Sequence, residues 1–113
     1  MSSLSLETRH DADRAILTLT GELDLATVPS LRDAALLELG AQGCTTLVLD
    51  LIGLTFLDST GLGCWVDLRN RADEDGKALE LQSVPPAAMR TVTIAGLASL
   101  FGLDATRSGN PPG

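Results

Sequence analysis

Aromatic and basic side chains are scarce in this sequence of 113 residues. Its aromatic residues are Phe56, Trp65 and Phe101, with no tyrosine, so it offers few platforms on which the bases of single-stranded nucleic acid could stack. Eight Lys and Arg stand against fifteen Asp and Glu, which gives a formal net charge of −7. Because an acidic surface repels phosphate groups, we expect neither nucleic acid nor an anionic membrane as a direct partner.

Cysteine and histidine are also rare, and long hydrophobic runs are absent. Cys44 and Cys64 lack the spacing of a metal site, and the only histidine, His10, is distant in the sequence. We therefore expect reduced thiols, no metal ion and no cofactor. The N-terminus lacks the basic start and apolar segment of a signal peptide, and no stretch approaches the length of a membrane span. These features favour a soluble, cytoplasmic protein.

The usual motifs of enzymes are missing. Ser59 has only half of the Gly-x-Ser-x-Gly pattern of hydrolases, because Leu57 takes the place of the first glycine. No lysine follows Gly61 and Gly63, as it would in a phosphate-binding loop. The sequence around His10 does not suggest a catalytic partner for Ser59. We therefore expect no catalytic residues and no enzymatic activity.

The sequence does contain a near-continuous apolar run, Leu47–Leu51, which is typical of a strand buried on both faces. The chain is then expected to turn through Gly53 and to reach Asp58-Ser59-Thr60, short polar residues of the kind that cap a helix. A helix with one apolar stripe should follow over about 59–72. Capping alone explains these polar residues, but a hydroxyl group where the loop meets the helix also makes this junction the expected place of function.

Periodicity along the rest of the chain predicts one α/β domain over residues 1–105, followed by a flexible tail over residues 106–113. The remaining expected elements are strands at 4–9 and 15–20, a helix with Thr27 as N-cap and Gly40 as C-cap, an edge strand at 79–82 and a short helix at 87–95. The first two strands should be antiparallel because their connection is short. Strands joined through a helix should be parallel, with a right-handed crossover.

Within this predicted order of strands and helices, one motif lies at the start of each of the two main helices. The two motifs are Gly21-Glu22-Leu23-Asp24-Leu25-Ala26-Thr27 and Phe56-Leu57-Asp58-Ser59-Thr60-Gly61-Leu62-Gly63. With them, residues 4–103 resemble the STAS-domain anti-sigma factor antagonists of bacteria. The resemblance implies a small mixed sheet of about four to five strands, mostly parallel at its centre, with helices packed mainly on one face. It also implies that a partner kinase phosphorylates the serine directly after the aspartate, which is Ser59 here.

In that family the kinase is itself an anti-sigma factor, and the unphosphorylated antagonist binds it and frees a sigma factor. By this resemblance Ser59 is the phosphorylation site, Asp58 orients the loop for the kinase, and a phosphatase that acts on phosphorylated Ser59 is a further expected partner. The residues that the resemblance places in the partner-binding surface are Asp58, Thr60, Gly61, Leu62, Glu22, Asp24 and Thr27.

Two other functions are compatible with the same residues. The first is a STAS module that is never phosphorylated and serves as a scaffold or as a subunit of a larger complex. The second is a small nucleotide-binding or hydrolytic domain, which nothing beyond the fold class favours. The sequence also departs from the family pattern in two ways. The final helix that often follows the positions of Leu100 and Phe101 is expected to be short or absent, and the large Trp65 either fills the core or lies at the surface beside Ser59.

Overall fold

The computed structural model describes residues 2–103, which form one mixed sheet and three helices. In chain order the elements are β1 (Leu4–Asp11), β2 (Arg14–Leu23), α1 (Val28–Leu39), β3 (Thr46–Leu57), α2 (Ser59–Glu74), β4 (Ala78–Gln82) and α3 (Pro86–Ile94). The sheet order is β1-β2-β3-β4, with β1 antiparallel to β2 and the other neighbours parallel. The predicted α/β fold with a mixed sheet and an edge strand near residue 80 is therefore confirmed.

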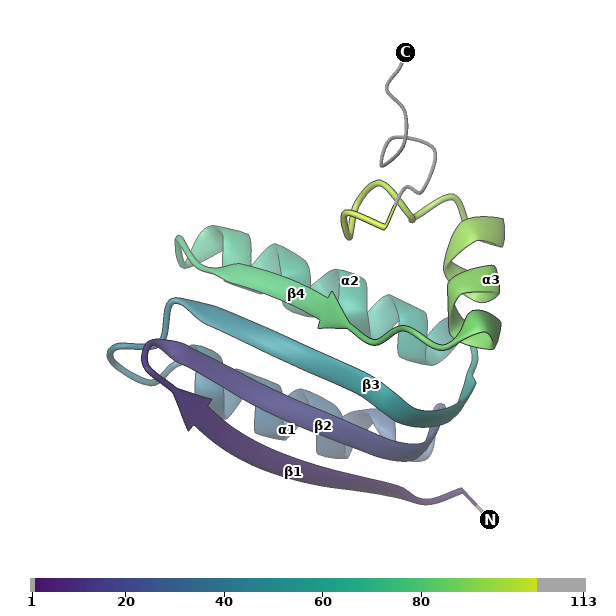
Figure 1. Cartoon of the computed structure of the whole chain (residues 1–113), viewed down its shortest axis with the longest axis horizontal. Helices are drawn as coiled ribbons and strands as arrows, with labels where there is room; N and C mark the ends of the chain where they lie inside the picture. The colour runs from purple at the N-terminus through teal and green to yellow at the C-terminus, as the bar shows by residue number, and fades with distance from the viewer. Residues whose placement is uncertain (1, 104–113) are drawn as a thin grey trace.

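Helices α1 and α2 cover the same face of the sheet, whereas α3 lies beside the end of β3 (Figure 1). The chain steps across the sheet in one direction, from β2 through α1 to β3 and then through α2 to β4. Because crossovers between parallel strands are right-handed, two steps in the same direction place both helices on one face. No helix within residues 2–103 is long and apolar enough to cross a membrane.

The strand β3 is longer than the sequence predicted. The expected strand ended at Leu51, and a loop through Gly53 was expected to lead to the helix, but the strand continues to Leu57. The loop prediction was wrong because the pairing of β2 with β3 shifts register in this region, which lets the two strands bend and stay paired. A Cβ atom at Gly53 would lie 2.8 Å from Thr20 Oγ1. This glycine thus permits two strands to approach closely and does not end one.

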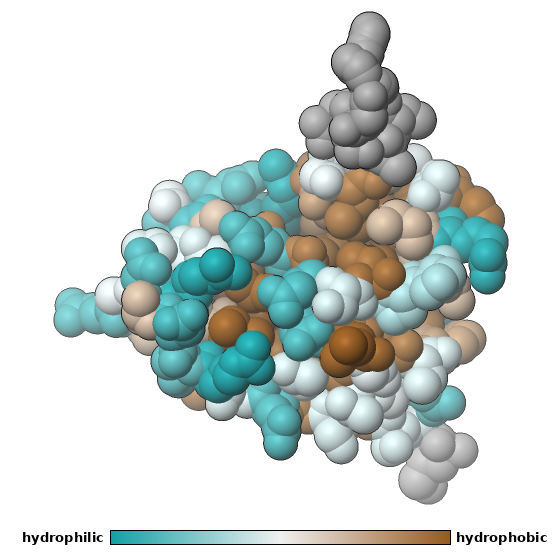
Figure 2. All heavy atoms as spheres, viewed as in Figure 1, coloured by the Kyte–Doolittle hydropathy of each residue, from teal (hydrophilic) through white to brown (hydrophobic). Residues whose placement is uncertain are grey.

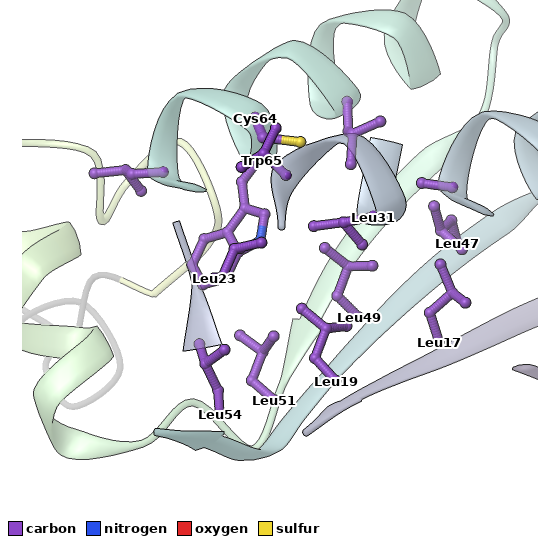
Figure 3. Close-up of a cluster of buried hydrophobic side chains, with 14 of the residues drawn as sticks. Leu17, Leu19, Leu23, Leu31, Leu47, Leu49, Leu51, Leu54, Cys64 and Trp65 are labelled. Atoms are coloured by element: carbon purple, nitrogen blue, oxygen red, sulfur yellow. The ribbon is translucent and has the colours of Figure 1, made fainter. Parts of the chain in front are cut away.

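The core between the sheet and the helices consists mainly of leucine, with one large aromatic side chain. Trp65 of α2 is fully buried and lies among leucines of the sheet and of α1 (Figure 3). Its ring meets that of Phe101 edge to face, with the ring centroids 6.3 Å apart. The structure therefore places Trp65 in the core and not at the surface. Its Nε1 has no hydrogen-bond acceptor within residues 2–103, which lowers stability because a buried N–H is left unpaired.

The chain beyond α3 forms turns, not a helix, as far as residue 103. Leu97, Phe101 and Leu103 in these turns pack against the core. The described part of the chain thus agrees with the expectation of a short or absent final helix. The predicted tail, residues 106–113, lies outside the described residues.

Lys77, the only lysine of the sequence, lies just before β4 and closes the end of α1. Its ammonium group donates to the carbonyl oxygen of Leu39, the last residue of α1, and so satisfies a carbonyl that the helix end leaves without a partner in the helix. It also donates to the carbonyl oxygen of Ala41 at 3.4 Å. We expect Lys77→Met to lower the free energy of unfolding by about 1 kcal/mol, measured by urea denaturation and circular dichroism. Arg9→Met is the matched control, because it removes the same charge from an exposed residue without an ion pair to residues 2–103. Equal losses in the two variants would contradict this capping role.

Candidate functional site

Asp58 connects the end of β3 to the start of α2, at the edge of the sheet where the parallel strands end (Figure 1). Its Oδ1 accepts a hydrogen bond from the Gly61 backbone N–H at 3.0 Å. The Asp58 backbone N–H in turn donates to the Leu23 carbonyl oxygen at 3.4 Å. Asp58 is therefore the N-cap of α2, as the sequence predicts, and it also ties the start of this helix to the end of β2.

Ser59 is the first residue of α2 and is exposed to solvent. Its hydroxyl makes no hydrogen bond to any of residues 2–103, so a reacting group can reach it without breaking an existing contact. The N–H groups at the start of a helix lack partners within the helix and carry partial positive charge. The position of Ser59 is therefore suited to hold an anionic group. Thr60 beside it is half-buried.

Gly61 and Leu62 are buried, although the resemblance places them in the partner-binding surface. Leu62 belongs to the hydrophobic core. A Cβ atom at Gly61 would lie 2.8 Å from Leu23 Cγ and 3.0 Å from the Leu23 carbonyl oxygen, so glycine allows α2 to pack closely against β2. Both residues hold the start of α2 in place beneath the exposed Ser59.

Gly61 and Gly63 are expected to respond to alanine in opposite ways. Gly61→Ala forces a methyl group against Leu23 and Leu57 and should lower the free energy of unfolding by about 1–3 kcal/mol. A Cβ atom at the exposed Gly63 meets nothing within 4 Å, so Gly63→Ala should raise stability by up to about 1 kcal/mol through helix propensity. Urea unfolding followed by the fluorescence of Trp65 measures both changes. A loss of stability in both variants would show that α2 does not pack as described.

Thr27 lies at the predicted capping position before α1, but its side chain makes no capping hydrogen bond. The hydroxyl donates to the Glu22 carbonyl oxygen at 2.8 Å and accepts from the Asp24 N–H at 3.0 Å. The predicted N-cap residue is therefore confirmed, but its hydroxyl bonds to backbone groups of the turn after β2 and not to the N–H groups of α1. Since Thr27 is buried, it shapes the loop from within.

Glu22 lies near the end of β2, Asp24 lies on the loop that follows, and both are partly exposed. The hydrogen bond that the Asp24 carboxylate accepts from the Ser2 hydroxyl lowers the pKa of Asp24, with smaller contributions from hydrogen bonds within the loop. Glu22 stands beside Phe56 in the register of β2 and β3. This end of the sheet is thus acidic, yet the described residues contain no group of three or more His, Cys, Asp or Glu that could hold a metal ion.

Two large apolar side chains at this end of the sheet had no predicted role. Phe56 is 47% exposed and Leu25 is 74% exposed, although each lies in a motif that leads into a helix. The exposure of Phe56 could have been predicted from its place directly before Leu57, which is buried. Neighbouring residues of a strand point to opposite faces of the sheet. Aromatic residues are enriched in protein interfaces, so the exposed Phe56 is a candidate contact residue.

Comparison with known proteins agrees with this architecture. The family described as Mlab, STAS domain matches residues 6–103. An anti-sigma-B factor antagonist from Staphylococcus epidermidis is 31% identical over 99 residues, which cover 88% of this chain and 91% of the relative. An anti-sigma factor antagonist from Mycobacterium paratuberculosis has a similar structure, with a TM-score of 0.78 and 22% identity over 98% of this chain and 87% of the other.

A second solved structure, of the Bacillus cell fate determinant SpoIIAA in the phosphorylated form, has a TM-score of 0.67 and 22% identity, and the match covers 86% of each chain. The two structural likenesses confirm the fold. The family match, which spans nearly all of the described residues, confirms the family that the two motifs indicate. The chain belongs to the STAS domain family.

Proposed function

We propose that this protein is an anti-sigma factor antagonist controlled by phosphorylation of Ser59. The unphosphorylated protein binds an anti-sigma factor that is also a serine kinase, and a sigma factor is released in the bacterial cytoplasm. Phosphorylation of Ser59 ends this binding, and a phosphatase restores it. The observation that carries the proposal is the exposed Ser59 hydroxyl, without a hydrogen bond to residues 2–103, directly after the Asp58 N-cap.

The relatives support both parts of this proposal. The protein from Staphylococcus epidermidis and the structure from Mycobacterium paratuberculosis are named as antagonists of anti-sigma factors. SpoIIAA is described in a phosphorylated form, which supports a switch based on a phosphate group.

A phosphate on Ser59 is compatible with the fold. It would lie at the positive end of the α2 dipole, near backbone N–H groups without helical partners, an arrangement that favours an anion by about 0.3–1 kcal/mol. Because Ser59 is exposed, the phosphate would also displace no core side chain. The switch therefore acts on the binding surface and leaves the domain folded.

The charge of the phosphate explains how binding would be lost. Phosphorylation adds about −1.5 to −2 charges at neutral pH, next to Asp58 and at the same end of the sheet as Glu22 and Asp24. A partner surface that accepts a small neutral hydroxyl would meet a bulky anion. Like-charge contact and the removal of water from that anion then oppose binding by several kcal/mol.

Mass analysis of the protein isolated from its own cells, in growth and under stress, tests this proposal. Trypsin should release residues 33–69 as one peptide, because no lysine or arginine lies between Arg32 and Arg69. This peptide also contains Thr60, so fragment spectra must assign the phosphate to one residue. A phosphate on Ser59 that changes with growth conditions is the expected result.

Two other outcomes would change the proposal. A Ser59 that stays unmodified under all conditions would favour the STAS scaffold that is never phosphorylated. A Ser59→Ala variant that remains a full phosphate acceptor would move the site to Thr60.

A further inference from the structure

We propose that the partner surface extends from Ser59 to a groove between β3 and α3, and that this groove binds an apolar side chain of the anti-sigma factor with a carboxylate beside it. This inference rests on the proposed function and adds a second point of contact to it. The last four residues of β3, 54–57, are part of the groove lining, and Ser59 follows two residues later at the start of α2. In the fold, α3 lies beside this end of β3 (Figure 1).

The groove has the size and lining of a pocket for one side chain. Its volume is about 260 Å³, which is below the range of about 300–1,000 Å³ typical of small-molecule sites. Buried apolar residues, Leu54, Leu57 and Ala88, line it together with the half-exposed ring of Phe56. Hydrophobic residues gather on the side of the molecule next to α3, whereas the other side of the same view is mainly hydrophilic (Figure 2).

The charge of the groove identifies the polar part of its occupant. Among the described residues that line the groove, Arg90 alone is charged, and it forms no ion pair with residues 2–103. No acidic residue within positions 2–103 lines the groove, although the whole chain carries a net charge of −7. A guanidinium group in the lining of an apolar pocket, without an ion pair to the described residues, is complementary to a carboxylate that follows or precedes an apolar side chain.

The neighbourhood of the groove sets the orientation of the partner. Glu22 and Phe56 are register partners in β2 and β3, and Phe56 and Arg90 line the same groove. An acid, an aromatic ring and a cation therefore follow one another across this end of the molecule. A partner with a basic group opposite Glu22 and an acidic group opposite Arg90 binds in one orientation, because the reverse orientation brings like charges together.

Binding of the purified serine-kinase anti-sigma factor to variants of the unphosphorylated protein tests this inference. Ser59→Ala, used as bait, identifies that partner, and calorimetric titration then gives the dissociation constants. We expect Arg90→Glu and Phe56→Ser each to weaken binding about tenfold or more, as for residues at the centre of an interface. Arg9→Glu is the matched control, because it changes the net charge equally at an exposed residue of β1, and it should change the affinity by less than about twofold.

The outcomes separate this inference from the proposed function. If no anti-sigma factor binds even Ser59→Ala, both are wrong. If the partner binds but Arg90→Glu and Phe56→Ser match the wild type, or if Arg9→Glu weakens binding as much as Arg90→Glu, only the groove is wrong. Circular dichroism of each variant shows whether it is folded. Should Phe56→Ser unfold, Arg90→Glu on the exposed side of α3 decides the question alone.

Discussion

Phosphorylation of Ser59 is expected to weaken binding of the anti-sigma factor by at least about a hundredfold, which corresponds to about 3 kcal/mol. The reason is local, because Ser59 is exposed beside Asp58 and the phosphate adds to an end of the sheet that already carries Glu22 and Asp24. Ser59→Asp adds one charge and less bulk, so it should weaken binding by about tenfold. Ser59→Ala should bind as tightly as the unphosphorylated wild type and should not respond to the kinase.

Calorimetric titration of these proteins with the purified anti-sigma factor measures the effect. Asn70→Asp is the matched control, since it adds one negative charge to an exposed residue of the same helix, far from its first turn. It should leave the affinity within about twofold of the wild type. Equal affinities of the phosphorylated and unphosphorylated proteins would overturn the proposed switch. All of these variants should unfold at nearly the temperature of the wild type, because Ser59 and Asn70 contribute no core contact.

Trp65→Ala is expected to lower the free energy of unfolding by about 3–5 kcal/mol. The side chain is fully buried among the leucines of the core and meets the ring of Phe101, so its loss removes contacts with both sheet and helices. For a domain of this size the change corresponds to a fall in Tm of about 4 °C per kcal/mol. A large share of the usual stability of about 5–15 kcal/mol would be lost.

Trp65→Phe should cost much less, by about 1–2 kcal/mol. It keeps a ring in contact with Phe101, and it removes the buried Nε1 hydrogen that has no acceptor within residues 2–103. Thermal unfolding followed by far-ultraviolet circular dichroism measures both variants, since neither retains the single tryptophan as a fluorescent probe. If the two losses were equal, the unpaired N–H would not contribute as described. If Trp65→Ala were as stable as the wild type, the core would be organised differently.

The stability and binding effects should be separable in this protein. Gly61, Leu62 and Trp65 are buried on the core side of α2, while Ser59 and Asn70 are exposed on it. Substitutions in the first group act through the packing of the helix on β2, and substitutions in the second act on the surface. A partner-binding defect that appears with a normal unfolding temperature therefore identifies a surface residue.

The elements of this fold follow from local patterns in the sequence. The apolar run at Leu47–Leu51 and the helical spacing after Ser59 are short-range signals, and the structure contains β3 and α2 at those places. Asp58 at the N-cap position could be predicted because capping involves a residue and a backbone group three positions away. The two motifs together indicated the STAS family, which the family match confirms.

The tertiary structure alone decided how these elements meet. In the structure β3 continues through Gly53, which lies close to β2. This could not be predicted, because a glycine that ends a strand and a glycine that lets another strand approach look the same in the sequence. In the structure the Thr27 hydroxyl also bonds to the backbone at the end of β2, and Trp65 is buried. Phe56 and Arg90 line the same groove. Each of these outcomes depends on contacts between residues far apart in the chain. Periodicity and spacing describe only near neighbours, so the sequence by itself determined which segments are strands and helices, and the packing of those segments determined which side chains remain available to a partner.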